Sequence, residues 1–324
     1  MAMNQTGMMT AGDLSPILWQ IHAIAFCLGC VIGSFLNVVV WRIPRGESLL
    51  TPPSHCPNCG HLIRAWENIP IISWLCLRGR CSGCHQPISI RYPLGESATG
   101  LLFFIIWYAI SRRNLPIAVL PGYFYLTGAL LSAALIDIKH RIIPNEITYS
   151  GLIVSLMLAL LMPTGRLALL VPRGNLALQL GGDPSHGSFF FSLVCTQVER
   201  LLGVDLLAMP IIAAFTDWLF GVFAGVVLLG VFAVGGRHLA KKPGAMGYGD
   251  VKLLGMCGGF LGADSVIYIS LVGAVVGAIW DLVHCIILRK KEWSLAFAPF
   301  LGLGVLAWMC FVNWFFFLFD KFGK

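Results

Sequence analysis

Charged residues are scarce in this sequence. Lys, Arg, Asp and Glu make up 11% of its 324 residues, whereas hydrophobic residues make up 57%. A typical soluble domain has about 25% charged residues, so the composition argues against a soluble globular protein. Long apolar runs separated by short polar loops indicate instead a chain that crosses a lipid bilayer several times.

The net charge of +7 does not indicate a nucleic-acid-binding protein, and we expect no nucleic-acid partner. The basic residues lie in short loops between apolar segments, as in membrane proteins whose cytosolic loops carry an excess of Lys and Arg. Segments 41–96, 138–146, 236–252 and 289–296 together hold 15 of the 22 basic residues. We therefore expect these four segments on the cytosolic side of the membrane.

The apolar segments predict an all-α polytopic membrane protein with about eight transmembrane helices. They cover residues 17–40, 97–111, 117–137, 147–162, 215–235, 251–263, 266–288 and 297–318. Two of them, 97–111 and 251–263, are short for a perpendicular span. The outer segment 163–214 is of mixed character, and its residues 189–207 suit an amphipathic helix lying on the bilayer.

Two Cys-x-x-Cys pairs predict a metal site in the polar segment 41–96. Cys56 and Cys59 form the first pair, and Cys81 and Cys84 form the second. Four thiolates at this spacing suit tetrahedral Zn²⁺, and a metal would replace a hydrophobic core that the segment is too polar to form. The cytosolic placement disfavours disulfides. The nearby histidines, His55, His61 and His85, are alternative ligands, but four cysteines already complete the shell.

A third Cys-x-x-Cys, Cys27 to Cys30, has no partner pair and lies inside the first apolar segment. Gly29 and Gly33 beside it have the GxxxG spacing that favours close packing of membrane helices. We therefore expect these residues to serve helix packing and not metal binding.

Carboxylates in or beside apolar segments are costly and are candidates for function. Asp137 and Asp250 stand apart because both fall at the cytosolic edge of the membrane, and two glycines precede Asp250. Two neighbouring carboxylates can share one proton, so the ionised member can activate water while the protonated member polarises a carbonyl group. The alternative is a pair of interfacial helix caps, or ion pairs with Lys139 and Lys252.

The other carboxylates have simpler interpretations. Glu96, Asp217, Asp264 and Asp320 fall at predicted segment ends, where water can solvate them. Asp281 lies deeper, with His284 one turn later, and a structural hydrogen bond in the helical bundle is the interpretation we favour there.

Six blocks of the sequence resemble the type IV prepilin peptidases. Met246-Gly247-Tyr248-Gly249-Asp250 resembles the GxGD motif of that family, and Asp137 followed by Ile143-Pro144-Asn145 resembles its other catalytic block. The remaining matches are Gly33-Ser34-Phe35-Leu36-Asn37, Glu67-Asn68-Ile69-Pro70 with the four cysteines, Arg91-Tyr92-Pro93-Leu94-Gly95-Glu96, and Ala296-Phe297-Ala298-Pro299-Phe300. Ala298 replaces a frequent Gly and Gly302 a frequent Ala, which are exchanges between small residues.

The resemblance implies two reactions at the cytosolic face of the bacterial inner membrane. An aspartic endopeptidase activity of Asp137 and Asp250 removes the leader of type IV prepilins or type II secretion pseudopilins. An N-methyltransferase activity then transfers a methyl group from S-adenosyl-L-methionine to the new amino terminus. The resemblance also implies Zn²⁺ on the four cysteines and offers Glu67, Arg91 and Glu96 as candidates for binding the methyl donor.

The same reasoning predicts three domains. Residues 1–40 form the outer N-terminus and first helix, residues 41–96 a cytosolic zinc-binding module, and residues 97–324 the membrane-embedded peptidase domain with its outer insertion 163–214. Two alternatives remain. A presenilin-like or signal-peptide-peptidase-like protease usually has Tyr before the first aspartate, where this chain has Ile136. An ion-coupled transporter would place its carboxylates near the bilayer midplane.

Overall fold

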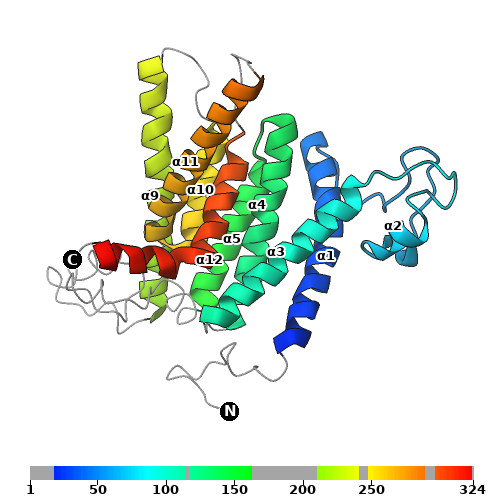
Figure 1. Ribbon diagram of the computed structural model, residues 1–324, viewed down its shortest axis with the longest axis horizontal. Coiled ribbons are helices and arrows are strands. Elements are labelled where there is room, and N and C mark those ends of the chain that lie inside the picture. The colour runs from blue at the N-terminus through cyan, green and yellow to red at the C-terminus, as the bar shows by residue number, and fades with distance from the viewer. Residues whose placement is uncertain (1–17, 114–116, 163–209, 241–246, 289–295, 323–324) are drawn as a thin grey trace. The chain divides into compact units, whose positions relative to one another are not determined.

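The computed structural model describes residues 18–113, 117–162, 210–240, 247–288 and 296–322. Over this part of the chain the structure is built from helices and loops without a β-strand, which confirms the predicted fold class (Figure 1). The chain divides into two compact units, an N-terminal unit within residues 12–112 and a C-terminal unit from residue 113 onward. The three-part domain division drawn from the sequence stays a prediction.

The N-terminal unit joins two long helices to a small irregular module. Its helices are α1 (Leu18–Arg42), α2 (Ile72–Cys76) and α3 (Arg91–Arg113), with short 3₁₀ turns at Ile43–Arg45 and Ala65–Asn68. Helices α1 and α3 meet through glycines, because a Cβ atom at Gly29 would lie 2.7 Å from the Cα of Gly100, and one at Gly33 would lie 2.9 Å from the Cα of Glu96. The packing role expected for the Cys27–Gly33 stretch is therefore confirmed.

In its described residues, the C-terminal unit is a bundle of six helices (Figure 1). They are α4 (Leu120–His140), α5 (Asn145–Leu161), α9 (Pro210–Ala240), α10 (Tyr248–Leu261), α11 (Ala263–Leu288) and α12 (Ala298–Phe322), and a 3₁₀ turn at Ile117–Val119 leads into α4. Helices α9 and α10 approach closely, since a Cβ atom at Gly258 would lie 2.1 Å from the carbonyl oxygen of Gly221. Small residues at such contacts are typical of helix packing in membranes.

The eight apolar segments coincide with α1, α3, α4, α5, α9, α10, α11 and α12. Within the described residues, five of these helices are long and apolar enough to cross a bilayer, and α5 and Ala298–Phe311 are shorter apolar helices. Helix α10 has 14 residues, or about 21 Å at 1.5 Å per residue, which is less than a hydrocarbon core of about 30 Å. The chain is thus a multi-pass membrane protein.

Local sequence explains where the helices beside the two aspartates begin and end. Helix α4 stops when Arg141 adopts a left-handed conformation (φ 58°) and donates its backbone N–H to the carbonyl oxygen of Asp137. Helix α5 starts directly after Pro144, whose extended backbone serves as its N-cap. Gly247 plays the same part for α10, and Gly262 (φ 81°) ends that helix. These caps place both aspartates within one turn of a helix end.

Several expectations are wrong. Glu96 is buried, because α3 begins five residues before it at Arg91. Asp217 is also fully buried, because α9 begins at Pro210 and not near residue 215. Asp281 is exposed on α11 and does not lie inside the bundle. Most of the insertion 163–214, including 189–207, and Asp320 lie outside the residues whose side chains the structure describes.

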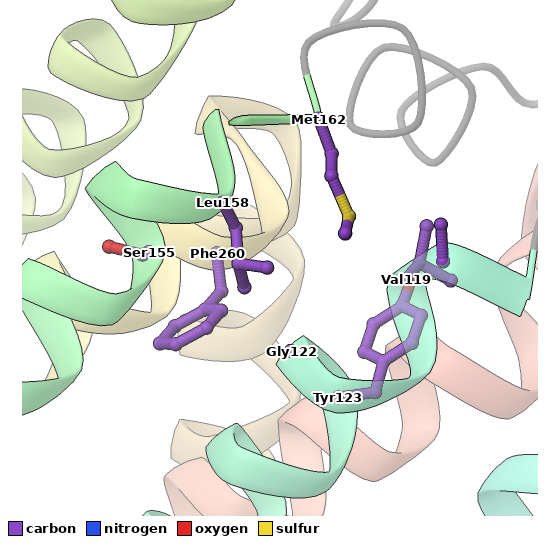
Figure 2. Close-up of a pocket in the computed structure, with 8 residues that line it drawn as sticks. Val119, Gly122, Tyr123, Ser155, Leu158, Met162 and Phe260 are labelled. Carbon is purple, nitrogen blue, oxygen red and sulfur yellow. The ribbon is translucent and has the colours of Figure 1, made fainter. Parts of the chain in front are cut away.

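A small pocket in the C-terminal unit lies far from the aspartates. It has a volume of about 30 Å³ and is lined from α4, α5 and α10 by residues that include Gly122, Leu158 and Phe260 (Figure 2). That volume suits about one water molecule. Gly122 precedes Asp137 by fifteen residues on the same helix, or about 22 Å along its axis. This pocket is therefore separate from the candidate site.

Candidate functional site

The four predicted metal ligands come together in the N-terminal unit. The Sγ atoms of Cys56, Cys59, Cys81 and Cys84 all lie within 4.8 Å of one another, and no other metal-ligand group of this kind occurs among the described residues. The Sγ atoms of Cys56 and Cys84 are 3.9 Å apart, and those of Cys59 and Cys81 are 4.0 Å apart. A Zn–S bond of about 2.3 Å requires about 3.8 Å between sulfurs of a tetrahedron, so the residues fit Zn²⁺.

The two cysteine pairs have the same backbone geometry. Cys56 donates its N–H to the carbonyl of His61, and Cys81 donates to that of Gln86. Each loop turns through a left-handed residue, which is Gly60 (φ 73°) in the first loop and His85 (φ 55°) in the second. The backbone N–H of Gln86 and the amide of Asn58 lower the pKa of Cys84 to about 6. A thiolate is the form that binds a metal.

Glu67 connects the two cysteine loops. Its Oε2 atom accepts the backbone N–H of Arg64 at 3.0 Å and lies 3.2 Å from Nε2 of His61, and that ring is 3.0 Å from the hydroxyl of Ser82. The Arg64 N–H, the Ser82 hydroxyl and His61 lower the pKa of Glu67 to about 2. Glu67 is therefore an ionised carboxylate beside the metal centre.

Glu96 and Arg91 have different surroundings from Glu67. Glu96 is buried and accepts the backbone N–H of Ile71 at 2.7 Å. Ile71 has φ 62°, a strained value for a β-branched residue, so the Glu96 carboxylate holds an unfavourable backbone conformation in place. Arg91 is exposed at the start of α3. No contact described in the structure joins Glu67, Arg91 and Glu96 to one another.

A groove of about 570 Å³ runs between α1 and the metal module. Phe35 and Val38 of α1 line one side, and Asn68, Ile69 and Pro70 line the other. Its volume lies in the usual range for pockets that bind small molecules and cofactors. Arg42 at its edge is buried and donates to the carbonyl oxygens of Ser48 and Pro52, which orders the loop after α1.

The two predicted aspartates lie together in the C-terminal unit. Asp137 is 7% exposed in the last turn of α4, and Asp250 is 8% exposed in the first turn of α10. The Asp137 carboxylate lies within electrostatic range of Asp250. Both carboxylates are therefore shielded from solvent at the ends of their helices.

The two carboxylates differ in their hydrogen bonds. Oδ2 of Asp137 accepts the backbone N–H of Ala298, the first residue of α12, at 3.2 Å. Oδ1 of Asp250 is buried and has no hydrogen-bond partner among the residues that the structure describes. An unsatisfied buried oxygen is rare and is often found at functional sites.

Two further contacts hold α10 against the segment that follows α4. A Cβ atom at Gly249 would lie 2.8 Å from Cβ of Ile143, so the second glycine of the motif allows the two backbones to approach. Lys252 donates to Oδ1 of Asn145 at 2.9 Å and lies 5.3 Å above the ring of Tyr149. The predicted ion-pair role for Lys252 is thus replaced by a bond to a neutral amide.

Sequence reasoning missed the contribution of Ala298. The block that contains Ala298 resembles a family motif, but the group that contacts Asp137 is a backbone N–H. Almost every residue type has that group, so the sequence does not reveal it. The contact joins residues 161 positions apart, so local patterns do not reveal it. The start of the predicted apolar segment 297–318 within that block was the only available signal.

Two family models cover most of the chain. The model for the bacterial peptidase A24 N-terminal domain matches residues 27–110, and the model for the type IV leader peptidase family matches residues 124–179 and 188–282. The first match contains the four cysteines, and the second contains both aspartates. No solved structure shows significant similarity to the chain.

Curated relatives have similar sequences over most of this chain. A prepilin leader peptidase/N-methyltransferase of Stutzerimonas stutzeri is 31% identical over 306 residues, which are 86% of this chain and 87% of the relative. The protein of the same name from Aeromonas hydrophila is 30% identical and covers 88% and 89%. The one from Myxococcus xanthus is 33% identical over 83% of this chain, which spans 66% of that relative.

Proposed function

Because the chain belongs to the type IV leader peptidase family, we propose that it removes the leader peptide of type IV prepilins or type II secretion pseudopilins and methylates the new amino terminus. The observation that carries the first reaction is the pair of buried aspartates, Asp137 and Asp250, within electrostatic range of each other. The names of the relatives support both reactions.

The peptidase reaction requires one ionised and one protonated carboxyl group. The ionised group takes a proton from water, and the hydroxyl that remains attacks the scissile carbonyl carbon while the protonated group gives its proton to the carbonyl oxygen. The neutral gem-diol then collapses. The first carboxyl group gives its proton to the departing amine as the C–N bond breaks, and the second recovers a proton from a diol hydroxyl. Both aspartates return to their starting states.

The location of the reaction follows from the charge distribution. The loop after α4 carries Lys139 and Arg141, and the loop before α10 belongs to the basic segment 236–252. The positive-inside rule places these loops on the cytosolic side. We therefore propose that the protein lies in the bacterial inner membrane, with Asp137 and Asp250 at its cytosolic edge. A transporter is not favoured, because its carboxylates would lie near the midplane.

The peptidase proposal is tested by mass spectrometry of a model prepilin incubated with the purified protein. Asp137→Asn and Asp250→Asn should each lower the cleavage rate by about 10³-fold or more, because each removes one half of the proton exchange. Asp281→Asn is the matched control, since it makes the same change at an exposed carboxylate on α11. Full cleavage by either active-site variant would exclude the assigned pair.

The methylation reaction belongs in our proposal to the N-terminal unit. S-adenosyl-L-methionine supplies an electrophilic methyl group, and the groove between α1 and segment 68–70 is large enough for it. Of the three candidates, Glu67 directly precedes Asn68 of the groove wall, and its carboxylate bonds to Arg64 and His61. Glu96 fits a positioning role, since its carboxylate accepts the backbone N–H of Ile71, which follows Pro70 of the groove wall. Arg91 remains a candidate at the N-terminus of α3.

Binding of S-adenosyl-L-methionine tests this placement without a peptidase substrate. Glu67→Gln should weaken the affinity of the purified protein for this compound by about tenfold, which is the loss of one charge-assisted contact. Equilibrium titration calorimetry measures the affinity, and Glu47→Gln, the same change at an exposed glutamate of the same unit, is the control. Equal affinities for the wild type and the Glu67 variant would remove Glu67 from the site.

We also propose that the four cysteines hold structural Zn²⁺. A closed set of four thiolates leaves no open position for a substrate, so the metal would order the module and take no part in the chemistry. The support is the agreement between the sulfur separations and a tetrahedral site. Elemental analysis of the purified protein measures the metal directly, and a protein free of zinc in each active preparation would refute the site.

A further inference from the structure

We infer that the backbone N–H of Ala298, at the start of α12, holds Asp137 in the ionised form, so that Asp137 is the base that activates water and Asp250 carries the shared proton. The inference deepens the proposed peptidase function, on which it rests. It assigns distinct roles to two carboxyl groups that the sequence treats alike.

The first support is the position of Asp137 at a helix N-terminus. Oδ2 of Asp137 accepts the N–H of Ala298 at 3.2 Å, and Ala298 is the first residue of α12. The first backbone N–H groups of a helix have no partner inside it, so the N–H of Ala298 is available to the carboxylate. A hydrogen bond from such a group stabilises a carboxylate more than a neutral carboxylic acid.

The second support is the different state of Asp250. This residue is 8% exposed, and its Oδ1 atom is buried without a hydrogen-bond partner in the described part of the chain. An ionised carboxylate in that setting would be desolvated, would leave its Oδ1 atom without a donor, and would face the negative charge of Asp137. A protonated carboxyl group avoids the charge and can donate its O–H.

Nearby charges do not reverse this preference. On α4 and the turn after it, Lys139, His140 and Arg141 follow Asp137, and Arg141 is the one with an electrostatic effect on its carboxylate. Among the described residues, α5 carries Glu146 as its charged side chain and α10 carries Lys252 besides Asp250, and Lys252 is bonded to Asn145. The first turn of α12 brings no acidic side chain toward Asp137.

The assignment gives each proton in the reaction a definite route. Water loses its proton to Asp137 as its oxygen bonds to the scissile carbon, and Asp250 protonates the carbonyl oxygen. When the C–N bond breaks, Asp137 passes its proton to the amine nitrogen, and Asp250 recovers one from the diol. Ala298 takes no part in bond formation. It is a positioning residue that sets which carboxyl group begins the cycle as the base.

The direct test is an infrared titration of each carboxyl group without its partner. The carbonyl stretch of a protonated carboxyl group is followed with pH in purified Asp250→Asn, which retains Asp137, and in Asp137→Asn, which retains Asp250. We expect the Asp137 midpoint to lie at least about one pH unit below the Asp250 midpoint, because both groups are buried and Asp137 alone accepts the N–H of Ala298. The reverse order, or equal midpoints, would overturn the inference.

The role of the backbone N–H is tested by Ala298→Pro. Proline removes this donor and is accepted in the first turn of a helix, and Ala298→Gly is the matched control because it keeps the N–H. With both aspartates present, Ala298→Pro should move the acid limb of the pH profile of cleavage upward by about one pH unit, because the ionised Asp137 loses a donor. Ala298→Gly should keep the acid limb of the wild type. An unmoved acid limb in a cleaving variant would overturn the role of Ala298.

These measurements separate the inference from the function. If the proline variant does not fold, the infrared titrations still test the inference, because they require neither cleavage nor that variant. A wild-type protein that fails to cut prepilins but shows the expected order of midpoints contradicts the proposed function alone. A protein that cuts prepilins with the reverse order of midpoints contradicts the inference alone.

Discussion

At the scale of single residues, Gly60 and His85 occupy equivalent turns of the two cysteine loops, and both have a left-handed backbone. A Cβ atom at Gly60 would meet no atom within 4 Å, so any cost of a side chain there comes from the backbone conformation alone. His85 already bears that cost. Residue type alone does not predict the left-handed conformation of His85, whose equivalent in the first loop is a glycine.

Gly60→Ala should therefore weaken metal retention. A left-handed conformation costs a non-glycine residue about 1 kcal/mol, and metal binding and folding of such a module are one process. We expect the apparent zinc affinity, measured by competition with a chelator, to fall about fivefold. His85→Gly is the control and should hold zinc at least as tightly as the wild type. Unchanged affinity in Gly60→Ala would show that the turn tolerates a side chain.

Residue types predicted which side chains come together in each cluster. They did not predict the difference between the two aspartates. Cys56, Cys59, Cys81 and Cys84 converge as their spacing required. Asp137 and Asp250 were both predicted at the cytosolic edge of the membrane. Helix ends at the same membrane depth can lie side by side, so this position predicted that the two residues are close. What distinguishes one aspartate from the other is a main-chain group of a distant helix, and main-chain groups are the same in every residue.

At the scale of elements, the contact between α9 and α10 is made by glycine against glycine. A Cβ atom at Gly258 would lie 2.1 Å from the carbonyl oxygen of Gly221, and one at Gly225 would lie 2.6 Å from that of Leu254. The contact includes backbone atoms on both sides, which cannot move aside as a flexible side chain can. Because Asp250 lies at the start of α10, this packing also fixes its height in the bundle.

Gly258→Ala should destabilise the C-terminal unit by about 1–3 kcal/mol, which is typical of overpacking. Gly230→Ala on α9 is the matched control, since a Cβ atom there meets nothing within 4 Å. Alanine is also the better helix former, so the control should be neutral or slightly more stable. Reversible unfolding in mixed micelles, followed by circular dichroism, compares the two. Equal stability of both variants would contradict the close approach of α9 and α10.

Hydrophobic runs located the helices and missed some of their ends. Helix α3 begins at Arg91, outside the apolar run, because polar residues continue a helix without changing its hydrogen bonds. Helix α9 begins at Pro210 and includes the apolar residues 211–214, which precede the expected start at 215. The burial of Glu96 and Asp217 followed from those extra turns. Glu96 satisfies a backbone N–H at Ile71, which pattern analysis could not anticipate from residues 25 positions apart.

At the scale of the whole molecule, the two proposed reactions belong to different compact units. The four cysteines, Glu67 and the groove lie in the N-terminal unit, whereas Asp137, Asp250 and Ala298 lie in the C-terminal unit. Each unit has its own helix contacts, made through Gly29 and Gly33 in one and through Gly258 in the other. We therefore expect that one reaction can be removed while the other persists.

Cys81→Ser tests this separation. The change removes one of four thiolates, so the variant should lose its zinc by elemental analysis and, with the module no longer ordered, lose methylation of the product. Asp137 and Asp250 belong to the other compact unit, so we expect the leader of a model prepilin still to be removed. Mass spectrometry of the product reads both outcomes at once, because an unmethylated mature chain differs in mass from a methylated one.

Cys76→Ser, at an exposed cysteine outside the cluster, should retain zinc, cleavage and methylation. Simultaneous loss of cleavage and methylation in a Cys81 variant whose C-terminal unit remains folded would show that the peptidase needs the metal module. Retention of a full zinc complement would instead refute the four-cysteine site.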